Sequence, residues 1–351
     1  MAFQKSDQRI INLVTGPTSG LGRAIIRGLV QNGETVRVVL KDVPDKYPEL
    51  AMLPAGVLPY VADLTFKRPS DQKNLEAACK GVTRVFHIAG ATPNTEYTYN
   101  QLIEINVIGT ENLIKSVLAA NPNPATPIHF LYSSSISVYG YKREKETLTE
   151  QSEPRPSSHY GESKLMAEHV VESFGESHKQ MIYTIMRLAT LYGRGYEKPH
   201  FFKAFKLVKE GRMRYIGRGN NHLSLLHVDD AADAMLLAAQ NPKSSANQVF
   251  NIADGYMHTP RQLFTLVANL MGVEPPNRSV NGAIARLLIK AAGISYDEYE
   301  FLVSDRVVDI SKIRKVLGFT PSRRGDVDGL VMVEDFMKSS KKIRGQSVVI
   351  Q

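Results

Sequence analysis

Near its beginning the chain reads Ile10-Ile11-Asn12-Leu13-Val14-Thr15-Gly16-Pro17-Thr18-Ser19-Gly20-Leu21-Gly22. The apolar run predicts a buried strand, and a helix over 23–31 is predicted to follow the glycines. Glycines let a backbone turn tightly, and free N–H groups at a helix start stabilise an anion. A β-branched run over 35–40 then predicts a second strand. The result is a βαβ unit of the kind that binds dinucleotides, although an ordinary strand-to-helix loop has a similar sequence.

A second motif, Tyr160-Gly161-Glu162-Ser163-Lys164, sets a phenol one helical turn from an ammonium if the segment to about 174 is helical. A nearby positive charge lowers the pKa of a phenol from its usual value of about 10. Ser135, within a run of three serines, adds a hydroxyl donor. Such a trio predicts acid–base chemistry on a carbonyl or alcohol. Taken alone, the spacing of Tyr160 and Lys164 favours a chance pair on a solvated helix face over a functional pair.

Strand-like and helix-like segments alternate along most of the chain. Strands are predicted near 10–15, 35–40, 57–62, 84–88, 128–133, 182–188 and 248–252, with helices between them. Two of these helices are expected at about 99–120 and 160–174. The alternation predicts an α/β protein with a doubly wound parallel sheet of the Rossmann type, covered on both faces.

After Leu191 the alternation breaks, and the length of 351 residues exceeds that of a minimal nucleotide-binding domain. We predict a nucleotide-binding domain over 8–190 plus 223–255, and a smaller, discontinuous, mainly helical substrate-binding domain over 191–222 plus 256–339. Residues 340–351 are a tail. In the smaller domain we expect helices at 201–210, 260–271 and 283–292, and a loop at 211–221.

The composition limits the class of protein. The chain is 43% hydrophobic and 22% charged, and it has no apolar run near the ~20 residues that cross a bilayer. A polar start and a single cysteine, Cys79, favour a cytoplasmic protein without an internal disulfide. The net charge of +8 is spread without a nucleic-acid motif, so we expect no nucleic-acid partner. His227, Asp229 and Asp230 suggest a capped helix start, and we expect no metal.

The two motifs and further segments in order resemble the extended branch of the short-chain dehydrogenase/reductase superfamily. This branch includes NAD(P)-dependent epimerases and dehydratases, 3β-hydroxysteroid dehydrogenases and dihydroflavonol reductases. The further segments are 61–65, 85–90, 106–113, 133–140, 227–234 and 250–255. One departure is Ser19, because extended members usually carry a glycine there.

The resemblance implies how a dinucleotide is held. Asp63 and Leu64 match the pair that holds the adenine ring, and Lys164 contacts the nicotinamide ribose. The implied cofactor-binding residues are Gly16, Thr18, Ser19, Gly20, Leu21, Gly22, Lys41, Asp63, Leu64, Ala89, Gly90, Tyr160 and Lys164. Lys41 matches a basic residue that contacts a 2′-phosphate, so NADP(H) is favoured over NAD(H), with Arg23 and Arg37 as helpers. The alternative makes Asp42 the acceptor for the ribose hydroxyls of NAD.

The resemblance also implies the catalytic roles. Tyr160 exchanges a proton with the substrate oxygen, Lys164 stabilises the phenolate, and Ser135 donates a hydrogen bond to the reacting oxygen, with Ser134 as second choice. Asn106 organises the site or makes a structural hydrogen bond. Thr190 and Tyr192, with Ser135, are expected to contact the substrate, whereas His87 is expected to be a packed residue. Helices 99–120 and 160–174 match the pair that forms a homodimer interface.

The substrate class is the least determined feature. Sugar-nucleotide members of the branch carry an Asn where Thr190 stands and an Arg where Leu223 stands. We therefore favour an oxidoreductase acting on a lipophilic ketone or aldehyde, sterol-like or β-keto. A nucleotide-sugar epimerase or dehydratase with bound NAD, using a phosphate cradle of Arg212, Arg214 and Arg218, is the first alternative. A non-catalytic NADP-sensing protein is the second.

Overall fold

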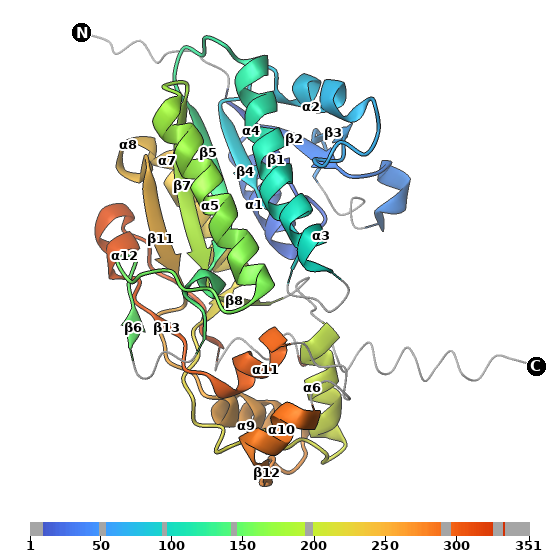
Figure 1. Ribbon diagram of the computed structural model, residues 1–351, viewed down its shortest axis with the longest axis vertical. Helices are drawn as coiled ribbons and strands as arrows, with labels where there is room; N and C mark the ends of the chain where they lie inside the picture. Colours follow the sequence, from blue (N-terminus) through green and yellow to red (C-terminus); the bar gives the residue numbers. More distant parts are fainter. Residues whose placement is uncertain are drawn as a thin grey trace, which may run out of the picture.

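The computed structural model describes residues 10–48, 54–92, 97–141, 146–193, 199–288, 296–325 and Val333. The predicted tail and residues 289–292 of the predicted helix at 283–292 lie outside these ranges. A sheet flanked by helices forms the larger part of the molecule, and a smaller group of helices lies at one end of it (Figure 1).

The central sheet has seven parallel strands in the order β3, β2, β1, β4, β5, β7 and β11. Their bounds are β1 Ile11–Thr15, β2 Thr35–Leu40, β3 Leu58–Val61, β4 Arg84–His87, β5 Ile128–Ser135, β7 Met181–Leu188 and β11 Gln248–Ile252. All seven lie at their predicted places, which confirms the Rossmann-type fold. The strand order reverses between β1 and β4, so a crevice for a ligand is expected at their carboxyl ends.

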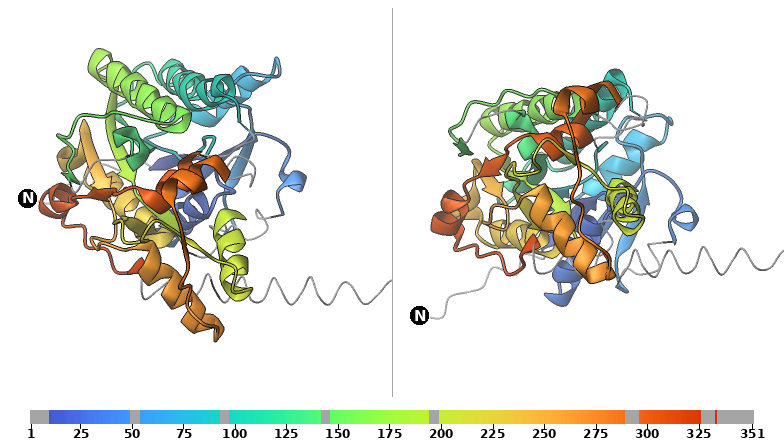
Figure 2. Two further views of the ribbon diagram at one scale, coloured as in Figure 1. Left: turned by 60° about the horizontal axis from the view of Figure 1, so that its bottom comes forward. Right: turned by 90° about the horizontal axis from the view of Figure 1, so that it is seen from below.

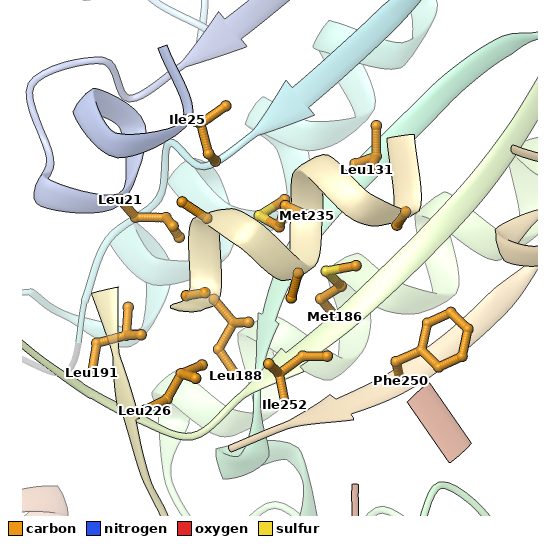
Figure 3. Packing of buried hydrophobic residues seen from close by; sticks show 14 of the residues in the cluster. Leu21, Ile25, Leu131, Met186, Leu188, Leu191, Leu226, Met235, Phe250 and Ile252 are labelled. Carbon is orange, nitrogen blue, oxygen red and sulfur yellow. The ribbon is translucent and has the colours of Figure 1, made fainter. Parts of the chain in front are cut away.

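Helices cover both faces of the sheet. Because successive strand residues point to opposite sides, neighbouring residues belong to different cores. Leu13 and Phe130 pack beneath α2 (Asp71–Cys79), α4 (Gly109–Ala120) and α5 (His159–Ser177). Their neighbours Val14 and Leu131 belong to the opposite core. There α1 (Gly20–Gln31) and α7 (Val228–Gln240) cover the sheet, and Met235 of α7 lies close to Leu131 and Met186 (Figure 3).

The helix predicted over 99–120 is continuous but not uniform. It begins as α3 (Tyr99–Ile103), widens into the π-helical turn η3 (Glu104–Ile108) and continues as α4. A π-helical turn adds one residue to a helical turn, and such turns are frequent at functional sites. This turn carries Asn106, which is buried.

The smaller group of helices, which we propose as the substrate-binding domain, has its own core. Phe205 and Val208 of α6 belong to one hydrophobic cluster with Phe264 and Val267 of α9. Figure 2 shows this group of helices from two further sides. The elements here are α6 Pro199–Lys209, β9 Tyr215–Ile216, α9 Pro260–Met271, β12 Ser279–Val280, α10 Gly282–Leu288 and α11 Tyr296–Val303. The segment 211–221 was predicted as a loop, but it contains β9, which pairs in parallel with β12.

Short elements connect the two parts. Strand β8 (Thr190–Tyr192) pairs with β10 (Leu225–His227), and β6 (Thr147–Leu148) pairs with β13 (Val307–Val308). The remaining elements are η1 Pro44–Lys46, η4 Ile136–Tyr139, α8 Pro242–Ser245 and α12 Ser311–Leu317. None of the helices in the described ranges is both long and apolar enough to cross a bilayer.

The start of α7 differs in detail from the prediction. His227, rather than a carboxylate, is the N-cap, because its Nδ1 accepts the Asp229 amide at 3.2 Å. Asp230 instead accepts hydrogen bonds from both Ser322 and Arg323. It therefore fixes the C-terminal segment onto α7, a role that sequence pattern alone does not reveal.

A buried ion pair joins α5 to the sheet. Glu168 and Arg187 approach to 2.7 Å, and their side chains are 1% and 6% exposed. The Arg187 guanidinium also donates to the Tyr139 hydroxyl at 2.9 Å, and Ser134 donates to Glu168. The carboxylate and the guanidinium therefore neutralise and hydrogen-bond each other at a position that water does not reach.

We expect Glu168→Ala to destabilise the protein by about 3–5 kcal/mol, because it leaves a buried guanidinium without its anion. Equilibrium urea unfolding measures the change. Glu111→Ala, which breaks the exposed Glu111–Lys115 pair, is the control and should cost less than about 1 kcal/mol. Equal costs for the two variants would contradict this account of the buried pair.

Candidate active site

The glycine turn is built by close backbone contacts. Gly16 has φ +68°, and a Cβ there would lie 2.8 Å from the Ala89 nitrogen. A Cβ on Gly22 would lie 2.2 Å from the Gly16 carbonyl oxygen. Ser19 is the N-cap of α1: its hydroxyl accepts the Gly22 amide at 3.0 Å and donates to the Gly16 carbonyl at 2.9 Å. The serine that departs from the usual glycine thus stabilises the turn that a dinucleotide would need.

Lys41 and Asp63 lie together at the carboxyl ends of β2 and β3. The Lys41 ammonium is 73% exposed and lies 3.6 Å from the Asp63 carboxylate. Asp42 instead binds its own loop, since it accepts the Val43 amide and pairs with Lys46 at 2.5 Å. This hydrogen bond to Lys46 is the main cause that lowers the pKa of Asp42. Each of the two thus has a charged neighbour, but the Lys41 side chain is the more exposed at this edge, at 73% against 36% for Asp42.

The proposed helpers of Lys41 differ in position. Arg37 points away from this edge, because it donates to the Ala78 and Lys80 carbonyls at the end of α2, so its prediction as a helper is wrong. Arg23 donates to the Thr18 carbonyl within the glycine turn. Arg68, which the sequence does not single out, donates to the Lys41 carbonyl at 2.7 Å and holds that residue's backbone.

Lys164 is buried beneath the site. Its ammonium donates to the Ser133 carbonyl at 2.7 Å and lies 4.4 Å from the centre of the Tyr132 ring. Burial lowers the pKa of Lys164 to about 7, opposed by the charge of Glu168. Each contact ties α5 to the end of β5, so the ammonium has one fixed position.

The three serines at the end of β5 are not equivalent. Ser133 donates to the His87 carbonyl at 3.1 Å, and Ser134 donates to Glu168. Ser135 is the one of the three that is not fully buried, and its hydroxyl bonds Ser137 at 3.1 Å. The second-choice donor Ser134 is therefore committed to the buried ion pair.

Asn106 links the end of β4 to α5. It accepts the Ala91 amide at 2.7 Å and donates to the Ser163 hydroxyl at 2.9 Å. Its carbonyl oxygen would lie 2.9 Å from a Cβ on Gly90, so the two segments are in close contact. The residue thus orders the wall beside Lys164 rather than reaching the cavity itself.

His87 is a packed residue, as expected. Its ring bonds the hydroxyls of Thr15 and Thr110 at 2.8 Å, and burial lowers its pKa to about 3. Thr15 also accepts the amides of Ile88 and Ala89 at 3.1 Å. This threonine, which sequence pattern treats as part of a strand, holds β4 against the glycine turn.

A cavity of about 300 Å³ brings the two motifs together. Ser19 and Leu21 of the glycine turn, Gly90, and the trio of Ser135, Tyr160 and Lys164 all line it. Thr190 and Tyr192 line it as well. The other predicted site residues are not among its lining residues: Gly16, Thr18, Gly20, Gly22, Lys41, Asp63, Leu64, Ala89 and Asn106.

The far side of the cavity is apolar. Its lining comes from three helices of the smaller group and comprises Ala204, Phe205, Leu263, Phe264, Leu266, Val267, Leu270 and Leu302. Arg306, which the sequence motifs did not identify, lines the cavity as well, and its guanidinium donates to the Ser137 hydroxyl near Ser135. The cavity therefore joins a polar end near Tyr160 to a lipophilic end.

The sequence profile of the NAD dependent epimerase/dehydratase family matches residues 12–253. The chain belongs to this family. It is an NAD(P)-dependent enzyme of the extended short-chain dehydrogenase/reductase type, as the resemblance implied.

Curated relatives support the same branch. The chain is 26% identical over 276 residues to a 2-alkyl-3-oxoalkanoate reductase of Stenotrophomonas maltophilia, covering 77% of this chain and 78% of the relative. It is 23% identical over 256 residues to a decarboxylating sterol-4-alpha-carboxylate 3-dehydrogenase of Dictyostelium discoideum, covering 72% and 74%.

Among solved structures, UDP-glucuronic acid 4-epimerase of Bacillus cereus, in complex with UDP-glucuronic acid and NAD, superimposes with a TM-score of 0.76. The alignment covers 94% of this chain and all of that one, at 18% identity. At this identity the similarity concerns the fold.

The buried Lys164 makes the stability of the folded chain depend on pH. Its pKa is about 7 in the folded chain and near 10.5 when unfolded, so the unfolded state binds more protons between these values and stability rises with pH across them. We expect Lys164→Met, without cofactor, to raise Tm most below pH 7, and the gain to shrink steadily toward pH 10. Differential scanning fluorimetry from pH 6 to 9.5 measures it. The exposed Lys115→Met is the control, and a gain in Tm that does not change with pH would contradict the assignment.

Proposed function

We propose that this enzyme is an NADP(H)-dependent oxidoreductase that interconverts a ketone or aldehyde and an alcohol on a lipophilic substrate. One observation carries the proposal: a single cavity runs from the glycine turn past Ser135, Tyr160 and Lys164 to an apolar wall. A carbonyl held at the polar end would place its hydrocarbon portion against that wall, where burial is favourable.

The residues fit a dinucleotide. A Cβ at Gly16 or Gly22 would fill the space of a tight backbone cradle, and the N-terminus of α1 favours a pyrophosphate there. The Lys41 side chain, which is exposed and lies 3.6 Å from Asp63, suits a 2′-phosphate, whereas Asp42 is bound at 2.5 Å to Lys46 and accepts the Val43 amide. These contacts support NADP(H) over NAD(H).

The chain's own groups supply acid–base chemistry and orientation. When bound, a reduced nicotinamide supplies hydride. Tyr160 donates a proton to the substrate oxygen, and Ser135 donates a hydrogen bond to the same oxygen. Lys164, which donates to the Ser133 carbonyl, stabilises the phenolate that forms and binds ribose hydroxyls in this proposal. Because the pKa of Lys164 is lowered by burial, a neighbouring negative charge would favour its charged form.

The names of two relatives support the β-keto class. A 2-alkyl-3-oxoalkanoate and a sterol-4-alpha-carboxylate both carry a carboxylate one carbon away from the reacting carbon, on a lipophilic body. The apolar lining from α6, α9 and α11 is compatible with such a body. We therefore propose this class before a simple sterol.

A nucleotide-sugar epimerase or dehydratase is the second candidate, favoured by the fold of the solved neighbours. The proposed phosphate cradle does not support it: Arg212 pairs with Glu210 at 3.1 Å, and Arg214 donates to carbonyls of its own loop. Neither they nor Arg218 line the described cavity. An NADP sensor without catalysis is less economical, since Tyr160 and Lys164 line one cavity.

We also propose a homodimer formed through α4 and α5. Ile108, the N-cap residue of α4, and Met166 of α5 are 44% and 38% exposed. Burying such side chains would favour association. The cytoplasmic location expected from the sequence stays a prediction.

Tyr160→Phe should lower turnover by about 100-fold or more, since proton transfer by a placed acid contributes about 10²–10⁴-fold. The Kd for NADPH should stay within about twofold, because the aromatic ring remains and only the hydroxyl is removed. NADPH absorbance with a panel of ketones, aldehydes and β-keto acids measures turnover, and a UDP-sugar conversion assay runs beside it. Tyr256→Phe, an exposed tyrosine outside the cavity lining, is the control. Sugar conversion without net redox change, or full turnover by Tyr160→Phe, would overturn the proposal.

Lys41→Glu should raise KM for NADPH at least about tenfold and leave KM for NADH within about threefold, because only NADPH carries the phosphate that the ammonium would pair with. Lys73→Glu, a charge reversal at an exposed position of α2, is the control, and we expect it to change both values little. Steady-state kinetics with both cofactors measures the difference. Equal shifts for NADPH and NADH would remove Lys41 from the phosphate site.

A further inference from the structure

Arg306 is a buried cation on the wall of the proposed substrate site. The residue is 6% exposed, yet it lines the cavity that Ser135 and Tyr160 also line. Its backbone is held on both sides, since its amide donates to the His222 carbonyl at 2.8 Å and its carbonyl accepts the Ser224 amide at 3.1 Å. These two hydrogen bonds fix the backbone from which the guanidinium extends.

The contacts of the Arg306 guanidinium are weak ones. It lies 4.7 Å from the centre of the Tyr141 ring, and its Nη1 donates to the Ser137 hydroxyl at 3.3 Å. Within the part of the chain that the structure describes, no carboxylate lies within ion-pair distance of it. A guanidinium has five N–H donors and a charge that is costly to bury without an anion.

Arg187 is a buried guanidinium whose charge is neutralised by a carboxylate of the chain itself. It reaches Glu168 through two of its nitrogens, at 2.7 to 3.2 Å, and donates to Tyr139 as well. Arg306 has no comparable partner among the described residues and faces the cavity instead. An anion that enters the cavity would supply the missing partner.

The position of Arg306 limits where that anion lies on the substrate. Ser137 bonds both Arg306 and Ser135, so the guanidinium is two hydrogen bonds away from the proposed donor to the reacting oxygen. A carboxylate one carbon away from the keto carbon would reach Arg306 while the keto oxygen stays at Ser135 and Tyr160. A long alkyl chain on the same molecule would extend along Phe264 and Leu263 of the apolar wall.

We propose that Arg306 binds the carboxylate of a 3-oxo or 3-hydroxy fatty-acid-like substrate, and so selects lipophilic β-keto acids over neutral ketones. This inference rests on the proposed function, which it makes specific. In the reduction, hydride from NADPH adds to the keto carbon and the Tyr160 proton to its oxygen. The products are the 3-hydroxy acid and NADP⁺, and the carboxylate is unchanged.

The first experiment measures binding, so that it does not depend on turnover. Isothermal titration of decanoate and of neutral methyl decanoate into the NADP⁺-loaded enzyme compares the wild type with Arg306→Met and Arg306→Lys. We expect decanoate to bind Arg306→Met at least about tenfold more weakly than the wild type, Arg306→Lys to recover part of the loss, and the ester to bind all three alike. Arg261→Met is the matched control, because Arg261 also lies over a tyrosine, Tyr215, but outside the cavity lining.

Folding of the variant is checked independently. Replacing an unpaired buried cation by an apolar side chain is neutral or stabilising, so the Tm of Arg306→Met without ligand should equal or exceed that of the wild type. A marked fall in Tm, or equal decanoate affinity in the wild type and Arg306→Met, would overturn the carboxylate assignment.

A second experiment separates this inference from the proposed function. Oxidation of 3-hydroxydecanoate and of its methyl ester by NADP⁺ should show a wild-type preference for the acid of at least about tenfold in kcat/KM, lost in Arg306→Met. Oxidation of both compounds with equal efficiency would sink the role of Arg306 and leave the oxidoreductase proposal standing. Binding of decanoate through Arg306 with no oxidation or reduction of any carbonyl compound would uphold the anion site and reject the proposed function.

Discussion

The Lys164 ammonium, buried under the cavity and bonded to the Ser133 carbonyl, ties α5 to the sheet. A charge in that position must be held by polar groups, because burial alone favours its neutral form. One turn further along α5, Glu168 binds Arg187 of β7. The same helix thus presents a lysine toward the cavity and a carboxylate toward the sheet, so the position of the site and the packing of α5 are set together.

The two ends of the cavity are shaped by different contacts: backbone contacts at one end and side-chain packing at the other. At the end formed by the glycine turn, backbone atoms are in closer contact than any side chain would allow, as Gly16 and Gly22 show, so its shape is nearly fixed. At the other end the lining comes from α6, α9 and α11, which pack around a small core of their own. Side chains there can change without disturbing the sheet, which is how one fold accommodates many substrates.

The sequence predicts most of the sheet because each strand is apolar on both faces and lies between turn residues. It also predicts the glycine turn and the Tyr160–Lys164 motif, since both depend on residues close together in the chain. It does not predict β9 with β12, because their pairing joins segments far apart in sequence. Arg37 failed as a helper for the same reason: only the folded chain shows that it reaches the end of α2. The π-helical turn at Asn106 leaves no signal in a pattern of helical period.

Arg187 and Arg306 both carry a buried guanidinium, but the two groups have different surroundings. Arg187 lies between a strand and a helix and receives a carboxylate from the chain itself. Arg306 is equally buried but lies on the cavity wall, where the described chain offers it a serine hydroxyl and an aromatic ring. A protein that needed only stability would gain from an apolar residue at 306, because an unpaired charge is costly to bury. Its presence beside Ser137 is therefore better explained by recognition of an anion than by folding.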